Sequence, residues 1–401
     1  MGRRLVSERV DVVVVGGGPA GLATSQQLRQ HGVPHRVLER GDTVGSTWAN
    51  LYDSLTLHTG KHMSSLPGMP FPRSAPLFVP RREFLDYLRG YAERFELPID
   101  TGRDAERIAR TDGTWTTHTS RGVLTAHIVV VATGIVANPK TPQFPGQERF
   151  AGRIAHSVAY RRPDGYAGRR VLVVGVGNSG AEIGSEIARA GGKVTVAVRS
   201  GANVVPLTLA GLPIQYVSYW VRKLPRRVQE GAVALVRLLT ELRRGKPVLP
   251  RPAHSPLDEI PVIGFHLVDA IAQGLIDVRV GVAELTADGA RFTDGTSGRF
   301  DEIILATGFG AALGPLGGLV QVDTKGFAHR RDRVVSLDQP GLYFVGHNYD
   351  AIGGLYNISR DARLAARLIA DQIRAAAPPP PPRTAAPPPR PPRTRSSRRR
   401  S

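Results

Sequence analysis

Two glycine-rich segments of this chain have the residue types and the spacing that bind a dinucleotide pyrophosphate. Each follows an apolar strand, opens a helical stretch and matches G-x-G-x-x-G: Gly16, Gly18 and Gly21 in the first segment, and Gly175, Gly177 and Gly180 in the second. The first glycine permits a tight turn, the second lets the backbone approach the phosphates, and the third lets helix and strand pack closely. The helix N-terminus then meets the anion, with Ser179 beside it in the second segment.

The strand that follows each glycine turn ends in a charge of opposite sign. Glu39 ends the first strand, and its carboxylate accepts hydrogen bonds from ribose hydroxyls and repels a 2′-phosphate, so this site suits FAD or NAD. Arg199 ends the second strand, and its guanidinium pairs with phosphate oxygens, so this site suits NADPH, with Ser200 able to assist. An FAD site followed by an NADPH site predicts that a nicotinamide reduces a flavin.

These residues need two parallel sheets to position them. The order strand, glycine turn, helix, strand occurs over residues 10–40 and again over 171–199. It predicts an α/β protein with two Rossmann-like dinucleotide-binding domains. Two further strands end in the same tripeptide, Ala-Thr-Gly, which we expect at the crossings between the domains: Thr133-Gly134 and Thr307-Gly308.

The order of these patterns predicts a nested arrangement of the two domains. The FAD domain is expected from both ends of the chain, with the NADPH domain inserted in the middle. We expect the first part of the FAD domain over residues 1–165, the NADPH domain over 166–309 and the second part of the FAD domain over 310–376. A Pro/Arg-rich tail follows over 377–401.

The composition excludes several kinds of chemistry. The chain of 401 residues has no cysteine, which excludes disulfides, thiolate metal sites and a Cys-x-x-Cys redox pair, and we predict no metal site. A disulfide reductase needs a dithiol beside its flavin, so the reduced flavin must pass its electrons to another acceptor. The uncharged stretch 203–221 contains Pro206, Gly211 and Pro213, so we predict no membrane span and a cytoplasmic protein.

The net charge of +19 is concentrated in part at the C-terminal end. The tail from Pro378 to Ser401 holds seven arginines and no acid, which leaves +12 for the rest of the chain. Its composition predicts disorder with polyproline character, and a solvated tail is a simpler interpretation than a tether to an anionic surface. The remaining charge suits anionic cofactors, and we predict no specific nucleic-acid partner. No pattern predicts the oligomeric state.

A more specific motif precedes the second glycine turn. The segment from Phe150 to Tyr160 reads F-x-G-x-x-x-H-x-x-x-Y and resembles the signature of the class B, flavin-containing monooxygenases. The Baeyer–Villiger branch ends this motif in Trp, so Tyr160 resembles the flavin-containing and N-hydroxylating branches. Further phrases within residues 10–375 are similar to the YUCCA-type members: Tyr52-Asp53-x-Leu55-x-Leu57-His58, Lys61, Leu66-Pro67, Phe71-Pro72, Gly177-Asn178-Ser179-Gly180, Leu305-Ala306-Thr307-Gly308-Phe309 and Gly341-Leu342-Tyr343-x-Val345-Gly346.

This resemblance implies a glutathione-reductase-like arrangement of the two domains and a defined reaction. NADPH reduces FAD by hydride transfer, O2 adds to the reduced flavin to give a C4a-hydroperoxide, and this species oxygenates a small organic substrate. For the YUCCA branch the resemblance implies a 2-oxo acid such as indole-3-pyruvate, which is decarboxylated oxidatively. Amines and sulfides are the wider substrate range of the family.

The resemblance also implies candidate catalytic residues. His156 is expected at the domain junction, where it controls the nicotinamide position or makes a structural hydrogen bond across the linker. His58 and Lys61 are expected either to orient the oxygenated flavin or to serve packing. Trp48 is expected near the isoalloxazine or in the core.

The chain departs from related flavoproteins after its last predicted strand. Flavoprotein reductases usually have Gly-Asp there, whereas Gly346, a candidate cofactor contact, is followed by His347 and Asn348. Contacts with the flavin ribityl chain must then come from elsewhere.

Two other functions stay open at this point. One is an NADPH oxidase or reductase that passes electrons to O2 or a small acceptor without oxygenation. The other is a flavin-binding interaction protein that acts through its basic tail. Peroxide release with every candidate substrate would identify the oxidase, and a partner bound through residues 378–401 would identify the interaction protein.

Overall fold

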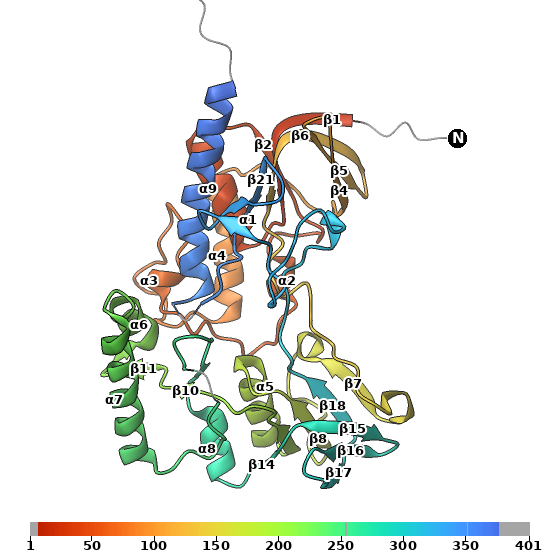
Figure 1. Cartoon of the computed structure of the whole chain (residues 1–401), viewed down its shortest axis with the longest axis vertical. Helices are drawn as coiled ribbons and strands as arrows, with labels where there is room; N and C mark the ends of the chain where they lie inside the picture. Colours follow the sequence, from red (N-terminus) through yellow and green to blue (C-terminus); the bar gives the residue numbers. More distant parts are fainter. Residues whose placement is uncertain (1–6, 253–254, 351, 377–401) are drawn as a thin grey trace, which may run out of the picture.

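The computed structural model describes residues 7–252, 255–350 and 352–376, which form two sheets with their helices, stacked along the long axis of the molecule (Figure 1). The first half of the molecule contains the beginning and the end of the described chain, and the second half contains the middle. The predicted tail over 377–401 lies outside the described residues. Within those residues, no helix is long and apolar enough to cross a bilayer.

The first sheet has nine strands with a parallel centre, in the order β19-β20-β21-β6-β1-β2-β3, and β5 and β4 extend it beside β6. Its strands are β1 (Ser7–Val15), β2 (His35–Leu38), β3 (Ile99–Asp100), β4 (Ala105–Thr111), β5 (Thr114–Thr119), β6 (Gly122–Val131), β19 (Arg330–Arg331), β20 (Val335–Ser336) and β21 (Leu342–Phe344). The valine run 12–15 of β1 is buried between β2 and β6, as expected for a parallel strand that is covered on both faces.

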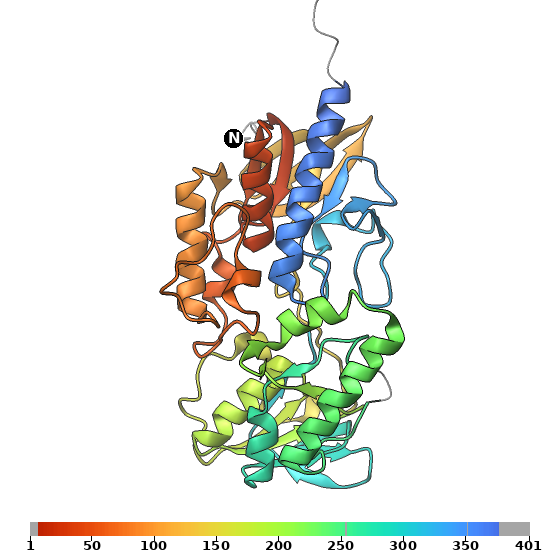
Figure 2. The same cartoon turned by 90° about the vertical axis from the view of Figure 1, so that its left-hand side faces the viewer.

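Helices α1 (Pro19–Gln30) and α9 (Gly354–Ala376) cover one face of the first sheet, and Figure 2 shows them side by side. Leu22 of α1 and Ile369 of α9 belong with Val12 to one buried cluster, which also includes the apolar face of α4 (Arg81–Arg94). This packing sets the direction in which α1 leaves the glycine turn.

The second sheet has five parallel strands in the order β14-β9-β8-β18-β7. Its strands are β7 (Arg153–His156), β8 (Arg170–Val174), β9 (Lys193–Ala197), β14 (Ile276–Arg279) and β18 (Glu302–Leu305). Helices α5 (Asn178–Arg189) and α8 (His266–Ala272) contribute to the buried cluster on one face of this sheet. Residues of β16 pack in the cluster on the other face, where β15 (Val282–Thr286), β16 (Gly289–Phe292) and β17 (Ser297–Arg299) form a small antiparallel sheet.

The remaining elements are short, apart from one helical hairpin. They are α2 (Ser46–Ala49), α3 (Lys61–Ser64), β10 (Val204–Val205), β11 (Thr208–Leu209), β12 (Leu212–Pro213), β13 (Val262–Ile263) and three single turns of 3-10 helix, η1 (Gln147–Arg149), η2 (Ser157–Ala159) and η3 (Gly314–Leu316). The hairpin is α6 (Ile214–Val221) and α7 (Arg226–Arg244), which lie on one side of the second half (Figures 1 and 2).

The chain crosses between the sheets twice, and the two crossings lie side by side. One leads from β6 toward β7 and the other leaves β18, and Pro139 and Phe309 form an antiparallel bridge between them. The first crossing comes earlier than the predicted boundary at 165/166, because β7 already pairs with β18 in the second sheet. That strand is four residues long and only its last residue is buried, so it carries little sequence signal.

The two glycine turns have the same local geometry. Gly16 has φ +112°, and a methyl group added there would lie 2.5 Å from the carbonyl oxygen of Ala132. Gly175 has φ +100°, and its added methyl group would lie 2.6 Å from the carbonyl oxygen of Ala306. Because these alanines begin the two Ala-Thr-Gly sequences, the backbone at the start of each crossing is in close contact with a glycine turn.

Candidate active site

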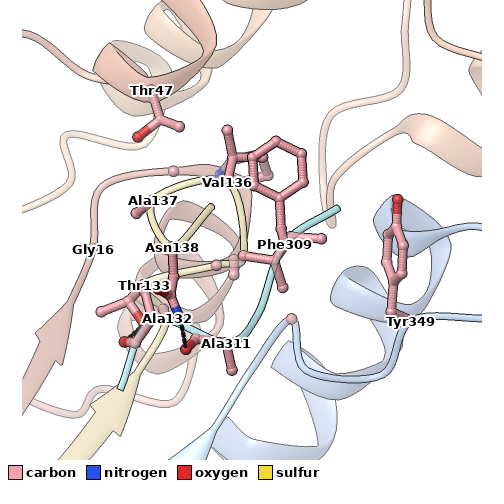
Figure 3. A pocket seen from close by; sticks show the side chains of 18 of the residues that line it. Gly16, Thr47, Ala132, Thr133, Val136, Ala137, Asn138, Phe309, Ala311 and Tyr349 are labelled. Carbon is pink, nitrogen blue, oxygen red and sulfur yellow. Dashed lines mark hydrogen bonds between the residues drawn. The ribbon is translucent and has the colours of Figure 1, made fainter. Parts of the chain in front are cut away.

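A cavity of about 1090 Å³ lies between the two halves, and both glycine turns open into it. Its lining includes Gly16, Gly18 and Glu39 from the first half, and Asn178 and Ser179 from the second half. These residues belong to the two glycine turns and to the end of the strand that follows the first turn. Figure 3 shows Thr133, Asn138, Phe309 and Ala311 of the two crossings on its wall. The cavity lies at the upper end of the size range for single small-molecule sites, so it has room for two ligands to meet.

At one end of this cavity, the carboxylate of Glu39 is held in place as a hydrogen-bond acceptor. Its buried carboxylate accepts hydrogen bonds from the amide of Gly17 (2.9 Å), the amide of Gly41 (2.8 Å) and the hydroxyl of Ser46 (2.7 Å). These donors fix the carboxylate and leave it with capacity to accept from ribose hydroxyls. The sequence did not predict the contact with Gly17. The two residues lie so close that a methyl group added to Gly17 would lie 2.8 Å from Glu39 Cβ.

Both helices that follow the glycine turns begin without a side-chain cap. Gly18 is the N-cap of α1 and Gly177 is the N-cap of α5, and neither helix has an acidic residue in its first turn. Their first backbone N–H groups are therefore free to meet a pyrophosphate. Gly21 and Gly180 allow close packing, since an added methyl group would lie 1.8 Å and 2.2 Å from the carbonyl oxygens of Gly16 and Gly175.

Arg199 and Ser200 lie just beyond β9 and are exposed. Within the described residues Arg199 has no ion-pair partner, and its backbone lies beside Gly281. Neither residue lines the cavity between the halves. A free guanidinium at the outer end of the second site has the position and the charge to pair with a phosphate on an adenosine ribose.

The other predicted cofactor contacts divide between the cavity wall and the crossings. Gly134, Gly346 and Trp48 line the cavity, and the edge of the Trp48 ring packs on Phe84 with the ring centroids 4.6 Å apart. Thr133 lines it too, but its hydroxyl donates to the carbonyl of Ala312 at 2.7 Å. Gly308 lies outside the wall.

His156 makes a structural bridge between the second sheet and the second crossing. Its Nε2 is 3.1 Å from the carbonyl oxygen of Gly308, and its Nδ1 accepts the amide of Val158 at 3.2 Å. The ring packs edge-on against Phe309, and burial lowers the pKa of His156. A neutral ring that donates through Nε2 satisfies both contacts. One of the two roles expected for His156 was a structural hydrogen bond across the linker. Its contacts are of this kind, and it is not part of the cavity wall.

His58 and Lys61 lie in different surroundings, although they are only three positions apart in the chain. His58 lines the cavity, and its Nε2 donates to Glu182 of α5. The Lys61 ammonium donates to the backbone carbonyls of Pro72, Arg73 and Ala75 and does not line the cavity. Lys61 therefore holds a loop, and this placement argues against a role in chemistry at the cavity.

Gln215 of α6 is a cavity residue that the sequence did not indicate. It is 1% exposed, it lines the cavity, and its Oε1 has no hydrogen-bond partner among the described residues. The sequence of segment 203–275 gives no regular pattern, so only the fold shows that α6 reaches the site. Asn178 holds the same segment in place, because it bonds the carbonyl of Pro261 and the amide of Ile263.

His347 follows Gly346 but does not line the cavity. It is buried, and neither ring nitrogen has a partner among the described residues. Burial, with a smaller effect of Arg330, lowers the pKa of His347 to about 3. Its neighbour Asn348 donates to Asp361 of α9 at 2.6 Å and so ties this loop to the helix.

Comparison with known proteins places this geometry in a family. A model of the pyridine nucleotide-disulphide oxidoreductases matches residues 13–208. Indole-3-pyruvate monooxygenase YUCCA1 of Oryza sativa subsp. japonica is 37% identical over 308 residues, which are 74% of this chain and 76% of the relative. Probable indole-3-pyruvate monooxygenase YUCCA4 of Arabidopsis thaliana is 35% identical over 307 residues, 74% of this chain and 75% of the relative.

Solved structures agree with this relationship. A flavin-containing monooxygenase from Stenotrophomonas maltophilia is 27% identical, has a TM-score of 0.73 and covers 91% of this chain and 99% of its own. A bacillithiol disulfide reductase from Staphylococcus aureus is 16% identical at a TM-score of 0.68 and shares the fold. Since this chain has no cysteine, the dithiol chemistry named in the matched family model does not extend to it.

The charged residues of the two nucleotide sites fit the two cofactors of such enzymes. The fixed carboxylate of Glu39 suits the adenosine ribose of FAD, and the free guanidinium of Arg199 suits the extra phosphate of NADPH. The predicted α/β fold with two Rossmann-like domains and the predicted family are both confirmed. The chain belongs to the YUCCA-type class B flavin monooxygenases, which depend on FAD and NADPH.

Proposed function

We propose that this protein oxidatively decarboxylates a 2-oxo acid with an aromatic side chain, and that indole-3-pyruvate is the first substrate to test. The observation that carries the proposal is that both nucleotide turns open into one cavity, in a chain without cysteine. The names of the relatives at 37% and 35% identity guide the choice of substrate. Use of O2 and a cytoplasmic location are parts of the same proposal.

The reaction balances with one equivalent of each reactant. A 2-oxo acid anion, NADPH, a proton and O2 give the acid anion shorter by one carbon, CO2, NADP⁺ and water. The bond between the carboxylate carbon and the oxo carbon breaks, one oxygen atom enters the new carboxylate, and the other leaves as water. Bound FAD supplies the redox chemistry between NADPH and O2.

The described residues hold, orient and shield the reactants. Glu39 and the N-terminus of α1 hold the flavin nucleotide in the first half, called the outer half below. Arg199 and the N-terminus of α5 hold NADPH in the second half, called the inserted half below. Leu57 and Ile263 are apolar parts of the cavity wall. A wall of this kind keeps water and stray protons from the reacting atoms.

One experiment separates this proposal from an oxidase or reductase. The FAD-loaded protein is given NADPH with indole-3-pyruvate, an amine or a thioether, and NADPH use, peroxide and product are measured together. One equivalent of indole-3-acetate per NADPH, with one atom of isotopically labelled O2 in its carboxylate, is the expected result. Quantitative peroxide without product from every compound contradicts the proposal and supports the oxidase.

A further inference from the structure

A loop of the outer half lines the cavity and is held by hydrogen bonds to α5 of the inserted half. The hydroxyl of Tyr52 and Nε2 of His58 both donate to Glu182. One helical turn later, Glu186 accepts from the hydroxyl of Ser54 at 2.9 Å and from that of Tyr160 at 3.0 Å. Glutamates four residues apart lie on one face of a helix, so a single face of α5 receives all four donors.

Glu182 is ionised in this arrangement and needs a compensating positive charge. Burial raises the pKa of Glu182, but the hydrogen bonds from His58 and Tyr52 outweigh it and hold the pKa below its usual value. The side chain is only 17% exposed, and within the described chain its one ion-pair partner is His58. His266 also faces Glu182, but burial lowers its pKa and so disfavours its charged form. A mostly buried carboxylate is stable only when paired, and His58 is the residue that pairs with Glu182 within the described chain.

His58 has a second ring nitrogen that is available to a ligand. Nε2 is committed to Glu182, and Nδ1 has no hydrogen-bond partner among the described residues. The side chain lines the cavity and is 23% exposed. An imidazolium donates from both nitrogens, so the same ring that pairs with Glu182 can donate to a second carboxylate through Nδ1.

No other cationic side chain of the described cavity wall lies at this end. The wall also includes Arg40 and Arg103, but both are at the end next to Glu39. Arg103 is committed to Asp100, at 2.9 Å between Nη1 and Oδ2. An anionic substrate beside α5 therefore meets His58.

We propose that Glu182 holds His58 as an imidazolium whose Nδ1–H binds the carboxylate of the substrate. In this scheme His58 is a substrate-binding residue and Glu182 is the positioning residue behind it. The inference rests on the proposed function, because it requires an anionic substrate, and it adds the residues that recognise the charge.

Steady-state kinetics of the FAD-loaded protein test the scheme on its reaction. His58→Gln is expected to raise KM for indole-3-pyruvate about 10- to 100-fold, with a smaller change in kcat and in KM for NADPH. His58→Arg should recover part of this loss because it restores the charge. Glu182→Gln should raise the same KM to a smaller extent, because the amide still accepts from His58 without compensating its charge. The matched control is His31→Gln, at an exposed histidine that caps the C-terminal end of α1.

Equilibrium binding to the oxidised, FAD-loaded protein tests the scheme without turnover. Calorimetry compares indole-3-acetate, which is anionic, with indole-3-ethanol, which is neutral. The preference for the acid over the alcohol should fall about 10- to 100-fold in His58→Gln and stay at the wild-type value in His31→Gln. FAD content and the melting temperature of each variant identify any that does not fold, and His58→Arg then takes its place.

The outcomes separate the two proposals. Wild-type protein that turns over no 2-oxo acid but prefers the indole acid through His58 contradicts the proposed function alone. Wild-type protein that turns over indole-3-pyruvate, with equal loss of acid and alcohol binding in His58→Gln, overturns the role of His58. A change confined to KM for NADPH also overturns it, because His58 would then contact the nicotinamide cofactor.

Discussion

Thr133 and Ala312 are joined by a 2.7 Å hydrogen bond from the threonine hydroxyl to the alanine carbonyl, although they are 179 positions apart in the chain. The bond connects the start of the first crossing with the second one. The Asn138 amide adds a parallel contact, since it donates to the carbonyl of Ala311 at 2.9 Å (Figure 3). The position of one half relative to the other therefore depends on contacts between the crossings.

Replacing Thr133 by valine removes the donor and keeps the shape of the side chain. We expect the free energy of unfolding to fall by about 1 kcal/mol, because the carbonyl of Ala312 loses its partner in a partly buried position. Denaturant unfolding of the FAD-loaded protein measures this change. Thr111→Val, at an exposed position of β4, is the control and should differ little from wild type. An equal loss in both variants would contradict the role of the crossing contact.

Glu39→Gln tests the assignment of FAD to the outer half. The amide carries no charge and turns one end into a donor, which then faces a donor from Gly17 or from Gly41. We expect FAD to dissociate about 10- to 100-fold more readily, measured from the recovery of flavin fluorescence on release. Glu148→Gln on the surface should retain FAD as the wild type does. Wild-type retention of FAD in Glu39→Gln would refute the assignment.

Arg199→Ala tests the assignment of NADPH to the inserted half. The exposed guanidinium has no competing partner among the described residues, so its loss should affect only a phosphorylated cofactor. We expect kcat/KM for NADPH to fall about 10-fold or more while kcat/KM for NADH changes little. Arg227→Ala, an exposed arginine of α7, is the matched control. An equal loss with both nicotinamides would place the 2′-phosphate elsewhere.

His347 predicts how stability depends on pH. Its folded pKa of about 3 lies below the usual value of 6.5, so an unfolded chain takes up a proton that the folded chain does not. As far as His347 is concerned, the folded state has its full stability above pH 6.5. It loses stability as the pH falls from 6.5 toward 3. At pH 5 the loss amounts to about 2 kcal/mol relative to pH 7.

His347→Leu should remove this part of the acid sensitivity. The ring nitrogens have no partners among the described residues, so the apolar replacement leaves no donor or acceptor unpaired. Unfolding free energies at pH 7 and pH 5 give the comparison, and His31→Gln should keep the wild-type difference. If His347→Leu loses as much stability at pH 5 as the wild type, the buried histidine is not the cause.

The sequence was sufficient for those parts of the fold that depend on local backbone requirements. The glycine turns at Gly16 and Gly175 need a left-handed backbone and a close carbonyl, so their patterns are strict and their positions were predicted. The apolar side chains of α7 recur at helical spacing, yet Leu235 is 56% exposed and Leu238 is 54% exposed. Helical periodicity indicates an apolar face and not what covers it.

The candidate site was predicted less completely because much of it depends on contacts between distant residues. Glu182 receives Tyr52 and His58 from 130 and 124 positions away, and no local pattern encodes such a pairing. Lys61 follows His58 closely in the sequence, yet its ammonium donates to the backbone carbonyls of a loop. Proximity in the sequence therefore did not predict which of the two reaches the cavity.

The neighbouring crossings have a mechanical consequence. Two connections far apart would brace the halves like a frame, whereas two that lie together and are bonded at Pro139 and Phe309 act as one narrow hinge. Rotation of one half relative to the other about such an axis widens or narrows the opening of the cavity, while the part of the cavity next to the crossings keeps its shape. The contacts of Tyr52 and His58 with Glu182 join the halves outside the crossings, so such a motion would have to break them.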